Sequence, residues 1–124
     1  MGNNSAVLIP TEHEEQREFV SWFRKTFKTV KIFAIPNGGS RNKIEAVKLK
    51  AEGVTSGVPD IYIPAWKLWV EMKRIKNSSL TKEQKEWRDY LISIGDSWLC
   101  CKGCEAAKEA VQNFIAKKKK IYYH

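Results

Sequence analysis

Glu71 and Lys73 are the first residues whose types and spacing suggest chemistry. They stand two residues apart in an apolar segment, next to Val70 and Met72. If this segment is a β-strand, the two charged side chains leave one face of the sheet and the two apolar side chains leave the other. A carboxylate beside an ammonium group takes part in catalysis in some proteins and is a plain ion pair in others. The pair alone leaves both interpretations open.

Asp60 adds a second carboxylate. It follows Pro59 at the start of a short apolar run, and a turn at 65–67 would join this run to the next strand as a hairpin. The start of one hairpin strand lies opposite the end of the other, so Asp60 is expected near Glu71 and Lys73. Two adjacent carboxylates repel each other, and a divalent cation with oxygen ligands relieves that repulsion. The three residues therefore predict a site for Mg²⁺ or Mn²⁺.

Glu12 is a third acid that points inward. It lies in the first turn of a predicted helix, within about 20° of the apolar stripe that contains Phe19. Burying a lone charge is costly, so an inward acid needs a partner. Acids are also common in first turns because they suit the helix dipole, which is the simpler interpretation. Glu15, about 40° to the other side of Phe19, is the alternative residue.

Gln84 is placed in the same way by a later helix. It stands three residues before Trp87 and seven before Leu91, which puts it on the inner stripe of that helix. An ordinary first-turn polar residue at the edge of the core would have the same spacing.

Helices and strands alternate along the chain and must position these residues. Apolar periodicity and turn residues predict helices over 12–28, 43–52, 82–94 and 104–116, and strands over 30–35, 60–64, 68–73 and 97–101. This order indicates an α/β fold with a central mixed β-sheet flanked by helices. We expect one domain over 1–124, with 1–10 as a lead-in and 117–124 as a basic tail.

The composition favours an intracellular protein that meets an anion. The formal net charge is +8, which is typical of small domains that bind nucleic acid. No apolar run approaches the ~20 residues that span a bilayer, and the first ten residues lack the features of a secretory signal. The Cys101-x-x-Cys104 pair lacks the second pair of a zinc site, so we expect reduced, structural cysteines. We expect no membrane and no small-molecule cofactor.

Candidate contacts to DNA phosphates flank the acidic residues. These candidates are Asn37, Arg41, Lys43, Arg74, Lys76, Lys82 and Lys85. Contacts of this kind are insensitive to base sequence and weaken with salt. Each group is equally compatible with a solvated face, and the segment 37–39 is equally compatible with a simple turn. Because no base-reading motif is evident, we expect recognition of DNA structure.

Several of these segments together resemble a known family. Pro59-Asp60 followed by Glu71-Met72-Lys73 resembles the PD-(D/E)xK nuclease superfamily. With Gly57-Val58 before the first motif and Gln84-Lys85-Glu86-Trp87 after the second, the chain is similar to a VRR-NUC domain of the short stand-alone phage type. The resemblance covers 12–110 and implies a restriction-endonuclease-like core.

The resemblance also implies roles for the site residues. The metal ligands that it implies are Asp60, Glu71, Glu12 and the backbone carbonyl of Met72. Lys73 would position or activate the attacking water, and Gln84 would support the site. Glu15 remains the alternative to Glu12.

The implied activity is a metal-dependent endonuclease that hydrolyses DNA phosphodiester bonds. The implied substrate is a Holliday junction or other branched DNA. Two symmetric cuts at a junction favour a homodimer. The implied setting is the cytoplasm of the bacterial host of a phage.

Two other classes of function remain open. One is a non-catalytic nucleic-acid-binding module on the same fold, and the other is a basic protein-interaction domain whose acids form salt bridges. A binding module has no need of clustered acids near DNA, so the combination of Asp60, Glu71 and Lys73 argues against it.

Replacing Asp60 or Glu71 with alanine separates these classes. In a nuclease, either change abolishes cleavage but leaves DNA binding equal or tighter, because a repulsive charge is removed. In a salt-bridge domain, the same changes lower stability instead. Cleavage assays, DNA-binding titrations and thermal melting of each variant make the distinction.

Overall fold

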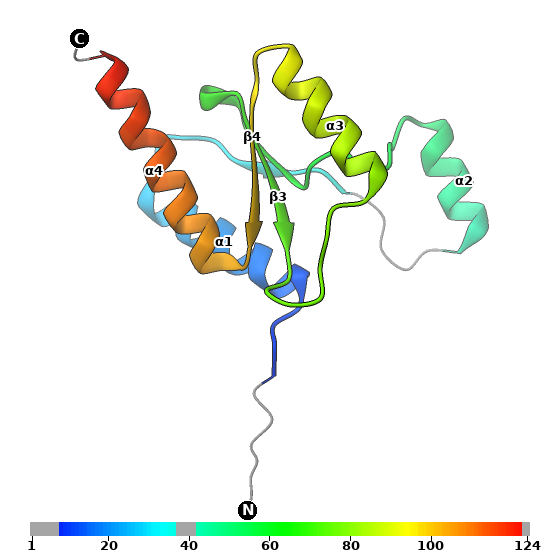
Figure 1. The fold of residues 1–124 in the computed structure, drawn as a ribbon. Coiled ribbons are helices and arrows are strands. Elements are labelled where there is room, and N and C mark those ends of the chain that lie inside the picture. Colours follow the sequence, from blue (N-terminus) through cyan, green and yellow to red (C-terminus); the bar gives the residue numbers. More distant parts are fainter. Residues whose placement is uncertain (1–7, 37–41, 123–124) are drawn as a thin grey trace, which may run out of the picture.

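A four-stranded mixed sheet forms the centre of the fold in the computed structural model, which describes residues 8–36 and 42–122 (Figure 1). The strands are β1 Phe33–Ala34, β2 Ile61–Ile63, β3 Leu68–Lys73 and β4 Ser97–Lys102, in that order across the sheet. β1, β2 and β3 pair antiparallel, whereas β3 and β4 pair parallel. A parallel pair needs a crossover connection, which a helix provides here.

Four α-helices and one short 3-10 helix accompany the sheet. They are α1 Glu12–Thr26, α2 Lys43–Ala51, η1 Pro64–Trp66, α3 Lys82–Ser93 and α4 Cys104–Tyr122. α3 is the crossover between β3 and β4, and η1 closes the hairpin between β2 and β3. Both α1 and α3 begin with a capping box, in which Thr11 pairs with Glu14 and Thr81 pairs with Gln84. The sequence predicts both helix starts, and the structure confirms them.

The hydrophobic core lies on one face of the sheet. Val70 and Met72 are fully buried on that face of β3. They share a core with Phe19 and Phe23 of α1 and Val111 of α4. Figure 1 shows α1 and α4 on this side and α3 on the opposite side. The α/β fold with a mixed sheet flanked by helices is therefore confirmed.

Several element boundaries differ from the sequence prediction. The strand predicted over 30–35 is only Phe33–Ala34, which pairs with Tyr62 and Ile61 of β2. The helix predicted over 104–116 continues to Tyr122. The lysines at 117–120 therefore lie in helix α4 and do not start a tail. That run contains neither Gly nor Pro, and lysine is a good helix former, so nothing stops the helix at residue 116.

Helix α2 differs from the other α-helices because none of its residues is buried. Figure 1 shows it beyond α3, away from the sheet. Within the described residues, no helix combines the length and apolarity needed to cross a lipid bilayer.

Candidate active site

The register of the β2–β3 hairpin brings Asp60 to the end of β3. Ile61 pairs with Val70, so Asp60, one residue earlier, lies across from Glu71. The Asp60 Oδ2 atom accepts a hydrogen bond of 2.8 Å from the backbone N–H of Met72. This bond fixes the carboxylate against β3, on the face predicted from the strand period.

Glu71 is only 1% exposed and uses just one of its two oxygens in a hydrogen bond. Gln84 Nε2 donates to Glu71 Oε2 over 3.2 Å. The amide of Gln84 is itself oriented, because its Oε1 accepts a bond of 2.9 Å from the N–H of Thr81 in the α3 capping box. Glu71 Oε1 is buried and has no hydrogen-bond partner within the described residues. A buried oxygen without a partner is a candidate position for a bound water molecule or ion.

Glu12 completes the acidic cluster from α1. Carboxylate oxygens of Glu12, Asp60 and Glu71 lie within 4.8 Å of one another. Partial burial and the Asp60 carboxylate raise the pKa of Glu12, and the ammonium group of Lys73 opposes this shift. The helix periodicity that favours Glu12 over Glu15 is consistent with this placement.

Glu15 has a different, structural position. It is 5% exposed, and its Oε1 accepts a hydrogen bond of 3.0 Å from the backbone N–H of Cys104, the first residue of α4. A carboxylate at a helix N-terminus is favoured by the unpaired N–H groups and the helix dipole. Glu15 therefore ties α1 to the start of α4 and lies outside the acidic cluster.

The three acids fit a divalent metal ion. Burial of Glu71, together with the neighbouring Asp60 carboxylate, raises its pKa to about 9, and Lys73 opposes the shift. Such a site is unfavourable for three negative charges alone, but its carboxylate oxygens are the ligands that Mg²⁺ and Mn²⁺ prefer. Lys73 is 7% exposed and supplies a fixed positive charge beside them. For Met72, the side chain faces the core, so only its backbone carbonyl is available as the predicted ligand.

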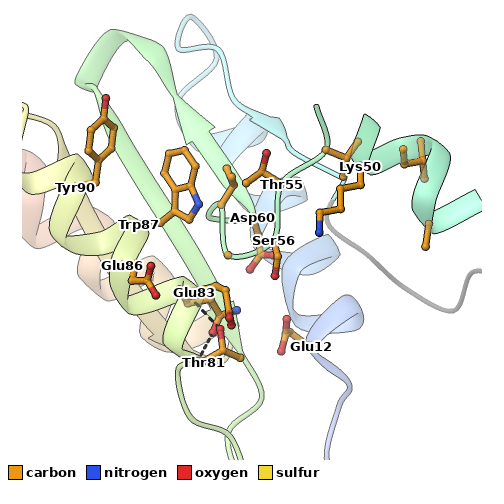
Figure 2. Close-up of a pocket in the computed structure, with 16 residues that line it drawn as sticks. Glu12, Lys50, Thr55, Ser56, Asp60, Thr81, Glu83, Glu86, Trp87 and Tyr90 are labelled. Atoms are coloured by element: carbon orange, nitrogen blue, oxygen red, sulfur yellow. Dashed lines mark hydrogen bonds between the residues drawn. The ribbon is translucent and has the colours of Figure 1, made fainter. Parts of the chain in front are cut away.

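A cleft of about 1190 Å³ opens beside the cluster (Figure 2). One side is formed by α3 and the other by α2 and the segment 54–60 that follows it. Glu12, Asp60 and Gln84 are part of its lining. The acidic cluster is therefore open to a ligand larger than a metal ion.

Gly57 holds the two sides of the cleft together. Its φ is +90°, and a Cβ atom there would lie 2.5 Å from the backbone carbon of Glu83 in α3. Only glycine allows this contact between the segment before Asp60 and the first turn of α3. The contact sets the approach of Asp60 and Gln84 to Glu71.

The predicted DNA contacts are distributed around the site and not inside the cleft. Lys43 lies in α2, Lys82 and Lys85 lie in α3, and all three are exposed. Lys76 is exposed and Arg74 is half-buried after β3. None of these five residues lines the cleft, and Asn37 and Arg41 lie outside the described residues.

The cleft also has lining residues that the predicted site does not include. Lys50 of α2 is one of them. Its spacing of four from Ala46, which also lines the cleft, places the two residues on the same face of α2. Trp87 and Tyr90 of α3 line the cleft as well. Their apolar type favours an assignment to the core, and the structure instead leaves Tyr90 55% exposed.

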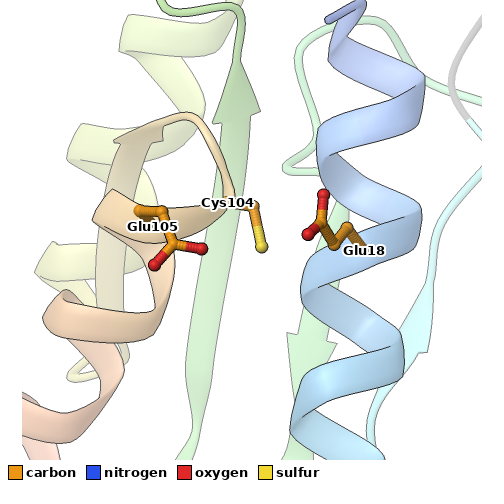
Figure 3. Close-up of side chains that lie close together, drawn as sticks. All are labelled: Glu18, Cys104 and Glu105. Atoms are coloured by element: carbon orange, nitrogen blue, oxygen red, sulfur yellow. The ribbon is translucent and has the colours of Figure 1, made fainter.

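A second group of metal-ligand types lies between α1 and α4 (Figure 3). Ligand atoms of Glu18, Cys104 and Glu105 lie within 4.8 Å of one another. Burial raises the pKa of Cys104, which disfavours the thiolate that binds metals, and Glu105 already pairs with Lys108 over 3.0 Å. All three cysteines are free, as predicted, and burial raises the pKa of Cys101 to about 12. This group is therefore a poor metal site.

The sheet and the acidic cluster together match a known arrangement. In this mixed sheet, an acid precedes one hairpin strand and Glu-x-Lys lies at the end of the next. This is a restriction-endonuclease-like arrangement. Among solved structures, the chain is similar to one described as "VRR_NUC domain protein", with a TM-score of 0.71 and 27% sequence identity over 88% of this chain and 91% of that one. No protein-family model and no curated protein matches the sequence. This likeness supports a VRR-NUC domain, as the motifs of the chain indicated.

The raised pKa of Glu71 predicts a pH-dependent effect of Glu71→Gln on stability. The folded pKa of about 9 exceeds the ordinary 4.5, so the contribution of this carboxyl to stability is greatest below pH 4.5 and is lost as the pH rises toward 9. Glutamine does not titrate. In EDTA, the variant should therefore gain stability relative to the unchanged protein between about pH 5 and pH 8, by a few kcal/mol.

Urea denaturation at both pH values measures this difference in the free energy of unfolding. Glu109→Gln replaces an exposed acid of α4 and is the matched control. A stability difference for Glu71→Gln that does not change with pH would contradict the prediction.

The close contact at Gly57 predicts that Gly57→Ala destabilises the chain more than Gly53→Ala. Both glycines have positive φ, but a Cβ at Gly53 would meet nothing within 4 Å. Gly53→Ala should cost only the backbone strain of about 1–2 kcal/mol. Gly57→Ala adds a backbone clash and should cost clearly more, as measured by urea denaturation. Equal costs would show that the loop moves freely away from α3.

Proposed function

We propose that the chain is a metal-dependent endonuclease that hydrolyses DNA phosphodiester bonds. The observation that carries the proposal is the convergence of three carboxylates beside the buried Lys73. One of these carboxylates has a buried oxygen that lacks a partner within the described residues. Burying like charges together is costly unless a cation compensates them. The likeness to a VRR-NUC structure independently supports a nuclease-type domain.

The residues of the cluster divide the chemistry between them. A Mg²⁺ or Mn²⁺ ion held by Glu12, Asp60 and Glu71, with the Met72 carbonyl as a further ligand, would supply Lewis acidity toward the phosphodiester and water. Lys73 leaves β3 on the same face as Glu71, so its ammonium group would stabilise the negative charge that develops on the phosphate and orient a water molecule.

Gln84 acts through Glu71 and is a positioning residue. Its amide is fixed by the N–H of Thr81 and donates to Glu71 Oε2, which leaves Glu71 Oε1 for a metal. The start of α3 thus decides which carboxylate oxygen is available.

The proposed substrate is branched or otherwise irregular DNA, with a Holliday junction as the specific candidate. The exposed lysines around the site, Lys43, Lys76, Lys82 and Lys85, suit contacts to phosphates, and such contacts follow the shape of the backbone. Two symmetric cuts at a junction would require a homodimer. We place this activity in the cytoplasm of a bacterial cell infected by a phage.

Incubation with linear, nicked, flap and four-way DNA tests the proposal. With Mg²⁺ or Mn²⁺ we expect cleavage, strongest on the four-way DNA, and none in EDTA. Glu71→Gln and Lys73→Met should each lower kcat by about 100-fold or more, because they remove a ligand or a charge that acts on the transition state. Glu109→Gln is the control and should cleave normally. Cleavage in EDTA, or full activity of Glu71→Gln, would overturn the proposed mechanism.

A further inference from the structure

The cleft extends from the acidic cluster to a pair of aromatic side chains. Trp87 lies one helical turn after Gln84, whose amide touches Glu71. The rings of Trp87 and Tyr90 meet edge to face, with centroids 5.7 Å apart and planes at 87°. Figure 2 shows both residues on α3, on the side of the helix that borders the cleft. One cleft thus joins a phosphodiester-cleaving cluster to an aromatic surface.

The wall opposite the aromatic pair is largely apolar. Ala46 and Leu49 of α2 and Val54 after it line this part of the cleft. The volume of about 1190 Å³ exceeds the 300–1,000 Å³ that is usual for small-molecule sites. A flat, apolar-faced group attached to a backbone would therefore fit between the two walls.

The charges on the cleft favour a neutral group over a phosphate. Glu83 and Glu86 of α3 line it and are exposed, and the cationic side chain among the described lining residues is Lys50. Phosphates deep in the cleft would meet these carboxylates, whereas a nucleobase carries no charge. The exposed Lys82 and Lys85 of the same helix lie outside the cleft, where a DNA backbone would pass.

We propose that the cleft holds an unpaired nucleobase, stacked on the Tyr90 ring with the Trp87 ring at its edge, of the strand whose phosphate lies at the acidic cluster. The inference rests on the proposed nuclease function and deepens it, because it names DNA with unpaired nucleotides beside the cut as the substrate class. Aromatic side chains are sequence-tolerant platforms for unpaired bases. A base inside a fully stacked duplex does not reach them.

Tyr90→Ala tests this proposal because Tyr90 is 55% exposed and contributes little to the core. Two DNAs are compared with Mg²⁺: a duplex with a two-nucleotide bulge and the same duplex with only a nick. We expect KM on the bulged DNA to rise about tenfold, since stacking on one aromatic ring is worth 1–3 kcal/mol, with little change on the nicked DNA. Tyr90→Phe keeps the ring and should restore the KM.

Ile92→Ala is the matched control. Ile92 is an apolar residue of the same helix, is 53% exposed, and does not line the cleft. It should leave both KM values unchanged. An equal effect of Tyr90→Ala on the two DNAs, or none on either, would overturn the base pocket.

A second readout does not depend on catalysis. With 2-aminopurine at the bulge and EDTA present, binding of the unchanged protein and Tyr90→Phe should quench its fluorescence, whereas Tyr90→Ala should quench it less. Absence of quenching by the unchanged protein at saturating concentration would reject the pocket. Absence of cleavage of every DNA would instead reject the nuclease function, so the two failures are distinguishable.

Discussion

The pairing register of β2 with β3 is the constraint on which the site depends. It places Asp60 across from Glu71, and the Met72 N–H then holds the Asp60 carboxylate at 2.8 Å. A shift of one residue would turn Glu71 toward the core and bring Val70 to the site face. Both faces of β3 are buried, so such a shift would place a charge in the apolar core and an apolar side chain among the acids. The core and the acidic cluster therefore enforce the same register.

The starts of two helices, α1 and α3, complete the site, and each uses its polar residues differently. At the start of α1, Glu12 faces the acids while Glu15 ties α1 to α4. At the start of α3, Gln84 both caps the helix and holds Glu71. Because these groups are tied to helix ends, the rigid elements themselves hold the cluster in place. A cluster of like charges needs this rigidity, since its members repel each other without a cation.

The distribution of charge separates two tasks. The chain carries a net charge of +8, but the charged residues described in the cleft lining are four acids and Lys50, and the candidate DNA-contacting lysines lie outside the cleft. In the proposed nuclease, long-range attraction of DNA and local binding of a metal ion would therefore come from different surfaces. Helix α2 buries no residue, and it forms part of one wall of the cleft.

From the sequence alone we predict the element types, the β2–β3 hairpin and the shared face of Glu71 and Lys73, because strand and helix periods fix the direction of each side chain. It favoured Glu12, but Glu12 and Glu15 differ by only about 60° around the helix. Only the packing of α1 against β3 and α4 separated their roles. The tertiary structure also decided the length of α4, the contact at Gly57 and the aromatic side of the cleft. Those features depend on distances between elements, and local periodicity sets directions but not such distances.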